Sequence, residues 1–115
     1  MNRLCYTGEK RDGMPHGVGI MTSWDGYQLQ GTFEKGYILE PFVMIMPNGA
    51  VLEGGFEQAT IFFPDGRMYV GHVKDYYPHG KGTMLYPDQR VYHGLFSRGE
   101  HSSQGIRVWS FNSYP

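Results

Sequence analysis

Residues 69–92 read YVGHVKDYYPHGKGTMLYPDQRVY, the pattern of one complete β-hairpin followed by the start of a second. In the first arm Tyr69, Gly71 and Val73 share one face of a strand, because alternate residues of a strand point to the same side. A Pro-His-Gly turn and a second arm follow, and the pattern starts again at Tyr92, 23 residues after Tyr69. A repeat of this length predicts an array of stacked hairpins.

The same pattern extends over the whole chain. A glycine stands two residues after the start of each repeat, at Gly8, Gly31, Gly54, Gly71 and Gly94. We predict one domain of five repeats, at 6–28, 29–51, 52–68 (shortened by six residues), 69–91 and 92–115. Of the 17 glycines, all but Gly55 fall on repeat positions. An aromatic ring from a neighbouring strand that lies over such bare backbone would compensate for the packing that glycine lacks.

The composition agrees with an all-β fold. Gly, Tyr, Phe and Trp are plentiful, whereas Ala and Leu, which favour helices, are scarce in the 115 residues. The net charge of −1, without a block of like charges, does not favour nucleic acid or a polybasic membrane anchor. Cys5 is the only cysteine, which excludes an intramolecular disulfide and is typical of a reducing compartment. Without a signal-like or membrane-spanning segment, we expect an intracellular, cytoplasmic protein.

Two stretches carry a family resemblance. Residues 6–19, YTGEKRDGMPHGVG, and residues 69–82 resemble MORN repeats, the membrane occupation and recognition nexus motif of about 23 residues. The resemblance implies an all-β fold: an elongated, single-layer, twisted antiparallel sheet of consecutive β-hairpin repeats, curved into a groove. It also implies a scaffold that dimerises, binds partner segments in the groove and occurs in cytoskeletal, ciliary or membrane-junction assemblies. Some members of the family are credited with phospholipid binding.

The chain departs from the repeat pattern in two informative places. Tyr76 stands where the other repeats have a glycine, at Gly13, Gly36 and Gly99. Residues 39–42, Leu-Glu-Pro-Phe, replace the His-Gly turn of the repeat. We therefore expect the middle of the array to be irregular.

Two apolar runs are the first candidate contact site. Their residues are Phe42, Val43, Met44, Ile45 and Met46 in one run, and Ile61, Phe62 and Phe63 in the other. From the repeat register we expect the two runs to be neighbouring strands with apolar side chains on both faces. An exposed, uncharged, β-prone run is an aggregation hazard. We therefore predict that these residues form an interface with a protein partner, in a homodimer or a larger complex.

A ladder of aromatic residues is the second candidate contact site. Its members are Tyr6, Phe33, Phe56, Tyr69, Tyr92 and Phe96. Aromatic cross-strand pairs stabilise a sheet by roughly 0.2 to 1 kcal/mol each. A ladder on an open sheet face is also a surface on which a partner helix or peptide can dock.

The sequence lacks the signatures of catalysis. His16 and His79 lie in matching turns, with no carboxylate or cysteine at metal-ligand spacing. The carboxylates are separated by whole repeats, and no nucleophile, phosphate-binding or dinucleotide motif appears. We predict a protein that is not an enzyme and has no cofactor, no metal and no small-molecule substrate.

The leading functional hypothesis is a scaffold subunit that binds partner proteins through its sheet face, its apolar runs and its end strands. The end strands, 2–6 and 108–111, have backbone groups that can add to a partner's sheet. The alternative is a module that binds phosphoinositides on an anionic membrane surface. The basic residues for it, Arg3, Lys10 and Arg11 near one end and Arg90, Arg98 and Arg107 near the other, are scattered and balanced by acids. Anionic lipid recognition uses clusters of such residues, so protein binding is favoured.

Overall fold

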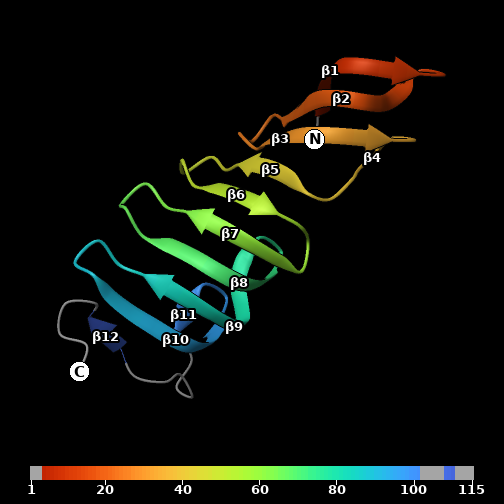
Figure 1. Cartoon of the computed structure of the whole chain (residues 1–115). Helices are drawn as coiled ribbons and strands as arrows, with labels where there is room; N and C mark the ends of the chain where they lie inside the picture. Colours follow the sequence, from red (N-terminus) through yellow and green to blue (C-terminus); the bar gives the residue numbers. More distant parts are fainter. Residues whose placement is uncertain (1–3, 102–107, 111–115) are drawn as a thin grey trace. The chain divides into compact units, whose positions relative to one another are not determined.

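The computed structural model describes residues 4–101 and 108–110, and every regular element among them is a β-strand (Figure 1). The strands are β1 (Leu4–Arg11), β2 (Met14–Ser23), β3 (Gln28–Glu34), β4 (Tyr37–Ile38), β5 (Phe42–Ile45), β6 (Val51–Gly54), β7 (Gln58–Phe62), β8 (Met68–Lys74), β9 (Tyr77–Leu85), β10 (Arg90–Ser97), β11 (Glu100–His101) and β12 (Val108–Ser110). The predicted all-β fold of consecutive antiparallel hairpins is confirmed.

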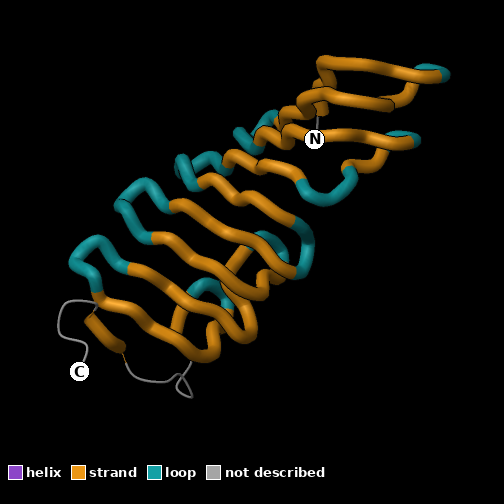
Figure 2. Tube along the Cα trace, viewed as in Figure 1, coloured by secondary structure: helices purple, strands orange, loops and turns teal. Residues whose placement is uncertain are grey.

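The chain forms two compact units, an N-terminal unit (Met1–Gly55) and a C-terminal unit (Phe56–Pro115). The boundary falls inside the shortened third repeat, 52–68. In the N-terminal unit the strand order is β1-β2-β3-β5-β6, with β4 also paired to β3. In the C-terminal unit β7, β8, β9 and β10 follow one another, and β11 and β12 both pair with β10. Short turns join most of these strands (Figure 2).

Glycines form a row across the middle of each unit. Gly19 lies opposite Gly8 on one side and Gly31 on the other, and Gly82 lies in the same way between Gly71 and Gly94. A Cβ atom at Gly82 would overlap the Tyr69 ring, and one at Gly71 would lie 2.5 Å from the Cα of Gly82. The rings therefore lie directly on glycine backbone of the neighbouring strand, as predicted.

Each tyrosine of this kind is also held by its hydroxyl group. The hydroxyls of Tyr6 and Tyr69 donate hydrogen bonds to the backbone carbonyls three residues later, at 2.6 Å to Glu9 and 2.5 Å to His72. The hydroxyl of Tyr92 donates in the same way to the Leu95 carbonyl at 3.2 Å. Tyr6 and Tyr69 thus cover a glycine of the neighbouring strand and are also bonded to the backbone of their own strand.

Aromatic rings meet one another in both units, where they pack with buried aliphatic side chains such as Leu52 and Ile61. In the C-terminal unit the Tyr69 and Tyr92 rings both meet the Phe96 ring edge to face, at centroid distances of 5.0 and 5.1 Å. In the N-terminal unit the Tyr6 and Phe33 rings meet in the same way at 5.1 Å. Such pairs contribute about 0.5 to 1.5 kcal/mol beyond the burial of their area.

A sheet can bury these rings because the strand ends beyond the glycine row bend. The pairing register between β8 and β9 shifts after Gly71. In the C-terminal unit, β11 and the first residues of β9 run at an angle to the long strands (Figure 1). The hairpin ends are then tied together, since the amide of Gly99 donates to the Pro78 carbonyl at 2.8 Å. The amide of Gly36 donates to the Pro15 carbonyl at 3.0 Å in the N-terminal unit.

The predicted irregularity lies at residues 39–42. Strand β3 pairs with the two-residue β4 near Phe33 and with β5 near Gln28, so two short strands share the edge that one long strand occupies elsewhere. The Glu40 side chain lies against Gly55, where a Cβ atom would meet the carboxylate. The one glycine outside the repeat pattern therefore leaves room for a side chain of the irregular segment.

Candidate functional site

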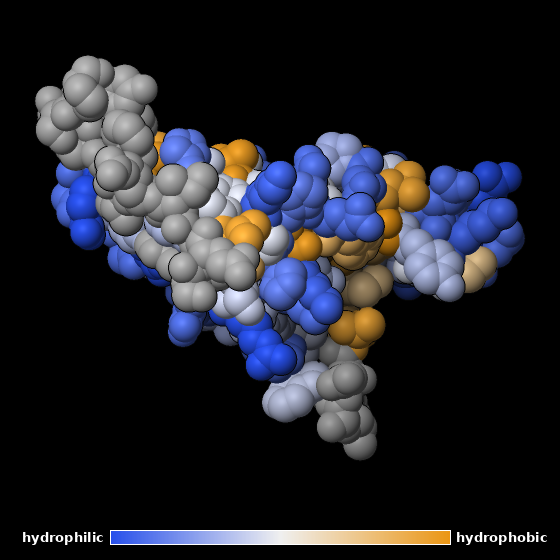
Figure 3. Space-filling model, turned by 90° about the horizontal axis from the view of Figure 1, so that it is seen from below, coloured by the Kyte–Doolittle hydropathy of each residue, from blue (hydrophilic) through white to orange (hydrophobic). Residues whose placement is uncertain are grey.

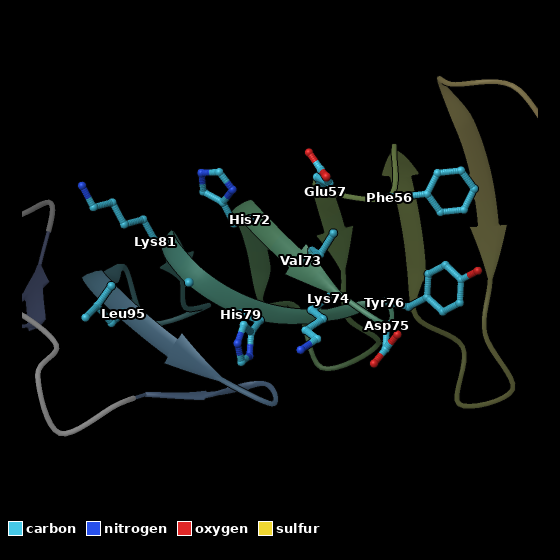
Figure 4. A pocket seen from close by; sticks show the side chains of 11 residues that line it. Phe56, Glu57, His72, Val73, Lys74, Asp75, Tyr76, His79, Lys81 and Leu95 are labelled. Carbon is cyan, nitrogen blue, oxygen red and sulfur yellow. The ribbon is translucent and has the colours of Figure 1, made fainter.

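A pocket of about 700 Å³ lies on the C-terminal unit, and we term it the β8–β9 pocket (Figure 4). It is lined by Phe56, Glu57, His72, Val73, Lys74, Asp75, Tyr76, His79, Gly80, Lys81 and Leu95. Its volume lies within the range of ligand sites. Most of its polar groups stand on the β8–β9 hairpin, and Leu95 adds an apolar side chain from β10.

Tyr76 occupies a backbone conformation that suits glycine. The two-residue turn between β8 and β9 has φ of 51° at Asp75 and 70° at Tyr76. The equivalent second position of the other hairpin turns is Gly13, Gly36 or Gly99, with φ of 78°, 89° and 88°. A bulky residue at such an angle is strained by about 1 to 3 kcal/mol. In this backbone conformation the Tyr76 side chain lines the pocket (Figure 4).

The pocket combines charged and apolar walls. The side chains of His72 and Lys81 extend to the same side of the β8–β9 ribbon, the side on which Glu57 also lies (Figure 4). Among the residues that the structure describes, the only ion pairs are Arg67 with Asp65 and Arg90 with Asp88, so Lys81 is in none. The arrangement is suited to hydrogen bonds and charge contacts with a bound segment.

The described ranges, 4–101 and 108–110, contain no group of three or more His, Cys, Asp or Glu side chains placed to hold a metal ion. The Nδ1 atom of His79 is buried and has no hydrogen-bond partner there. In the same part of the chain no helix has the length and apolar character that crossing a bilayer requires.

Burial raises the pKa of Tyr69 from 10 to about 12, because the phenolate would lose its hydration in the core. The unfolded chain then loses this proton near pH 10 and the folded chain only near pH 12, so we expect the free energy of unfolding to fall between these values. Tyr69→Phe should flatten this fall and lose about 1 kcal/mol at pH 8, where the bond to the His72 carbonyl is intact. Urea denaturation at pH 8, 10 and 11 measures both effects.

Part of the fall should persist in Tyr69→Phe, since burial also raises the pKa of Tyr86. An equal fall in the parent chain and in Tyr69→Phe would contradict the assignment to Tyr69.

Most of the predicted aromatic ladder lies in the core. Phe33, Tyr69, Tyr92 and Phe96 are buried. Tyr6 is half-buried, and Phe56 keeps 46% of its surface exposed. Phe56 is also the one ladder residue that lines the β8–β9 pocket.

The two apolar runs are not neighbouring strands, so that prediction is wrong. Both sides of β5 are occupied within the N-terminal unit, by β3 and by β6, while the second run lies on and after β7, which pairs with β8. Burial alternates along the first run: Phe42 and Met44 are buried, whereas Val43, Ile45 and Met46 are half-buried. In the second run Ile61 is buried, Phe63 half-buried and Phe62 exposed.

Apolar side chains are exposed in both units, for example Val18 and Trp24 in the N-terminal unit and Val70 in the C-terminal unit. Figure 3 shows one face of the molecule, on which hydrophilic side chains predominate. Of the predicted end strands, residues 2–3 and 111 lie outside the described residues, as do Arg3 and Arg107. The described parts of these strands pair inside their own units, β1 with β2 and β12 with β10.

Sequence reasoning missed most of the pocket. Of the predicted contact residues only Phe56 lines it, whereas His72, Tyr76 and Lys81 were not proposed as contacts. The signal that could have found them is Tyr76 itself, because it replaces a turn glycine of the repeat.

A search of curated proteins found no match to this chain. The family model of the MORN repeat matches residues 6–26 and 69–89. These two stretches contain the tyrosine-over-glycine hairpins β1–β2 and β8–β9. MORN repeats are generally non-catalytic modules that bind proteins or membranes. The sequence match and the repeated hairpin geometry together identify residues 6–26 and 69–89 of this chain as MORN repeats.

Proposed function

We propose that this protein is a non-catalytic scaffold subunit, and that it binds an extended segment of a partner protein in the β8–β9 pocket. Tyr76 carries the proposal: a strained tyrosine stands on the pocket wall where three matching turns have glycine. Strained backbone conformations of this kind cluster at active sites, ligand clamps and switch regions. A place in a cytoskeletal, ciliary or organellar assembly belongs to the same proposal and rests on the family alone.

The shape and chemistry of the pocket suit a peptide chain. Val73 and Leu95 provide apolar contacts, and the exposed Phe56 ring extends them. His72 and Lys81 provide polar groups on one side (Figure 4). The exposed Phe62 and the half-buried Val43 remain candidates for further contacts with a partner or a second copy of the chain.

A membrane-surface role has less support from the charges. The guanidinium group of Arg67 lies 4.2 Å from the Phe63 ring centroid and pairs with Asp65 at 2.8 Å. Arg90 lies 5.2 Å from the Tyr86 ring centroid and pairs with Asp88, also at 2.8 Å. Each of these cations is thus engaged within its own turn, and anionic lipid surfaces attract clusters of available ones.

Tyr76→Gly should separate stability from binding. Relief of the positive-φ strain should raise the free energy of unfolding by about 1 kcal/mol. The loss of the ring should weaken partner binding about tenfold, as the loss of a well-packed aromatic contact does. Thermal denaturation measures the first effect. Crosslinking of the native complex through Lys74 and Lys81, followed by mass spectrometry, measures the second.

Tyr77→Ala is the matched control, since Tyr77 is 55% exposed in the same turn region and does not line the pocket. It should leave the crosslinks unchanged. Crosslinks through the pocket lysines that survive Tyr76→Gly at full yield would overturn the proposal. Flotation with phosphoinositide vesicles, lost in Lys10→Glu with Arg11→Glu, would instead support the membrane role.

A further inference from the structure

The two tyrosine-over-glycine hairpins contain the same β-bulge. In the N-terminal unit Glu9 alone lies opposite residues 16–18, between the pairs Gly8–Gly19 and Lys10–Pro15. In the C-terminal unit His72 alone lies opposite residues 79–81. The local geometry agrees closely: a Cβ atom on the first-strand glycine would lie 2.5 Å from the opposite glycine Cα in both hairpins. The same atom would lie 2.6 Å from the Val18 or the Lys81 carbonyl oxygen.

In the N-terminal hairpin a carboxylate fills the bulge. The Oε1 atom of Glu9 accepts a hydrogen bond from the Val18 amide at 2.8 Å. The carboxylate lies over Gly17, where a Cβ atom would collide with it. Gly17 has φ of +92° and no side chain, so the bulge both points an amide outward and leaves room for an acceptor.

In the C-terminal hairpin the bulge is built alike but lacks its own carboxylate. Gly80 has φ of +90°, and the nearest side-chain atom to a Cβ placed there is the Cβ of His72, at 3.4 Å. No side chain in the described part of the chain accepts a hydrogen bond from the Lys81 amide. His72, Gly80 and Lys81 all line the β8–β9 pocket.

We propose that this bulge binds one carboxylate of a partner protein, from a glutamate or aspartate side chain in an extended segment. The carboxylate would accept from the Lys81 amide, as that of Glu9 does from Val18, with the Lys81 ammonium and the His72 ring beside it. An ionised acceptor strengthens such hydrogen bonds. The inference rests on the proposed function and names the chemistry of the partner.

The rest of the pocket limits the partner to a single acid. Glu57 and Asp75 also line the pocket and form no ion pair within the described residues, so further negative charge on the partner would be repelled. Val73 and Leu95 favour apolar side chains on either side of the acid. Alternate residues of an extended segment face the same way, which predicts an apolar, acidic, apolar pattern at every second position.

The test uses the full chain labelled with ¹⁵N and two seven-residue peptides of alternating serine and valine, in which the central residue is glutamate or glutamine. We expect the glutamate peptide to bind at least tenfold more tightly and to move the Lys81 amide proton downfield. His72→Glu should move this resonance without peptide and weaken the glutamate peptide at least tenfold. His72→Leu, whose side chain carries no hydrogen-bond acceptor, should retain the preference for glutamate. In the reciprocal Glu9→His the bulge is opened in the same way, but Val18 stands at the position of Lys81, so no second site should appear.

The outcomes separate this inference from the broader one. Equal binding of both peptides would overturn the carboxylate site and leave peptide binding in the pocket intact. Failure of both peptides to move the Lys81 amide would overturn the carboxylate site, while the crosslinking of Tyr76→Gly decides the pocket independently. Inorganic phosphate that produces the same shift and displaces the glutamate peptide would show that the bulge selects phosphate, and would overturn the assignment to a carboxylate.

Discussion

Gly82→Ala is expected to destabilise the C-terminal unit by about 3 kcal/mol, the upper part of the range for overpacked cores. The new Cβ atom would overlap the Tyr69 ring, which has no exposed surface and is held by its hydroxyl group. Tyr69 therefore cannot move aside without leaving the core. Urea denaturation at pH 8 measures the change.

A double-mutant cycle tests the cause. Tyr69→Leu removes the ring, and in that background Gly82→Ala should cost less than 1 kcal/mol, because contacting residues are not additive. Lys81→Ala, at an exposed neighbouring position, is the matched control and should be close to neutral. If the cost of Gly82→Ala is the same with and without the tyrosine ring, the ring-over-glycine contact does not explain the glycine.

Phe33→Ala is expected to destabilise the N-terminal unit by about 3 to 5 kcal/mol, as for other buried aromatic residues. Phe33 is 2% exposed and meets the Tyr6 ring edge to face. Phe56→Ala, at a ring that is 46% exposed, should cost less than half as much. Denaturation curves of the two variants compare a core role with a surface role within the same aromatic ladder.

Phe33→Leu keeps most of the apolar volume and should recover the larger part of the loss. If Phe33→Ala were as mild as Phe56→Ala, Phe33 would not belong to the core of its unit. The partner crosslinks described above should be insensitive to Phe33→Leu, since Phe33 does not line the pocket.

The sequence predicted the hairpins and the rings over glycine because both depend on short-range spacing. The alternation around Gly71 places a large residue on each side of it, and the period of two fixes which face they share. The bulge opposite His72 is different, because it depends on how many residues of β9 face one residue of β8. Alternation within one strand carries no information on that count.

Two further features of the structure were not predicted from the sequence pattern. The bulge lets the strand ends bend over the rings, so Tyr69 and Phe96 are buried in a fold whose repeat pattern alone indicates an open face. The expected pairing of the two apolar runs is wrong because first and second arms alternate in consecutive hairpins, so the second arm β5 pairs with two first arms, β3 and β6, and not with another second arm. Tyr76 was visible as a departure from glycine, but its position in a pocket depends on the bend.

The hydrogen bond from each repeat tyrosine ends on a backbone carbonyl, at Glu9, His72 or Leu95, and makes no use of the side chain that this residue carries. Three unlike side chains therefore stand three residues after a tyrosine that makes the same hydrogen bond. Each of these three repeats can accept variation at that single position while the hydrogen bond is kept. A combinatorial library at these three positions would show how far the recognition properties of such a scaffold can be rewritten.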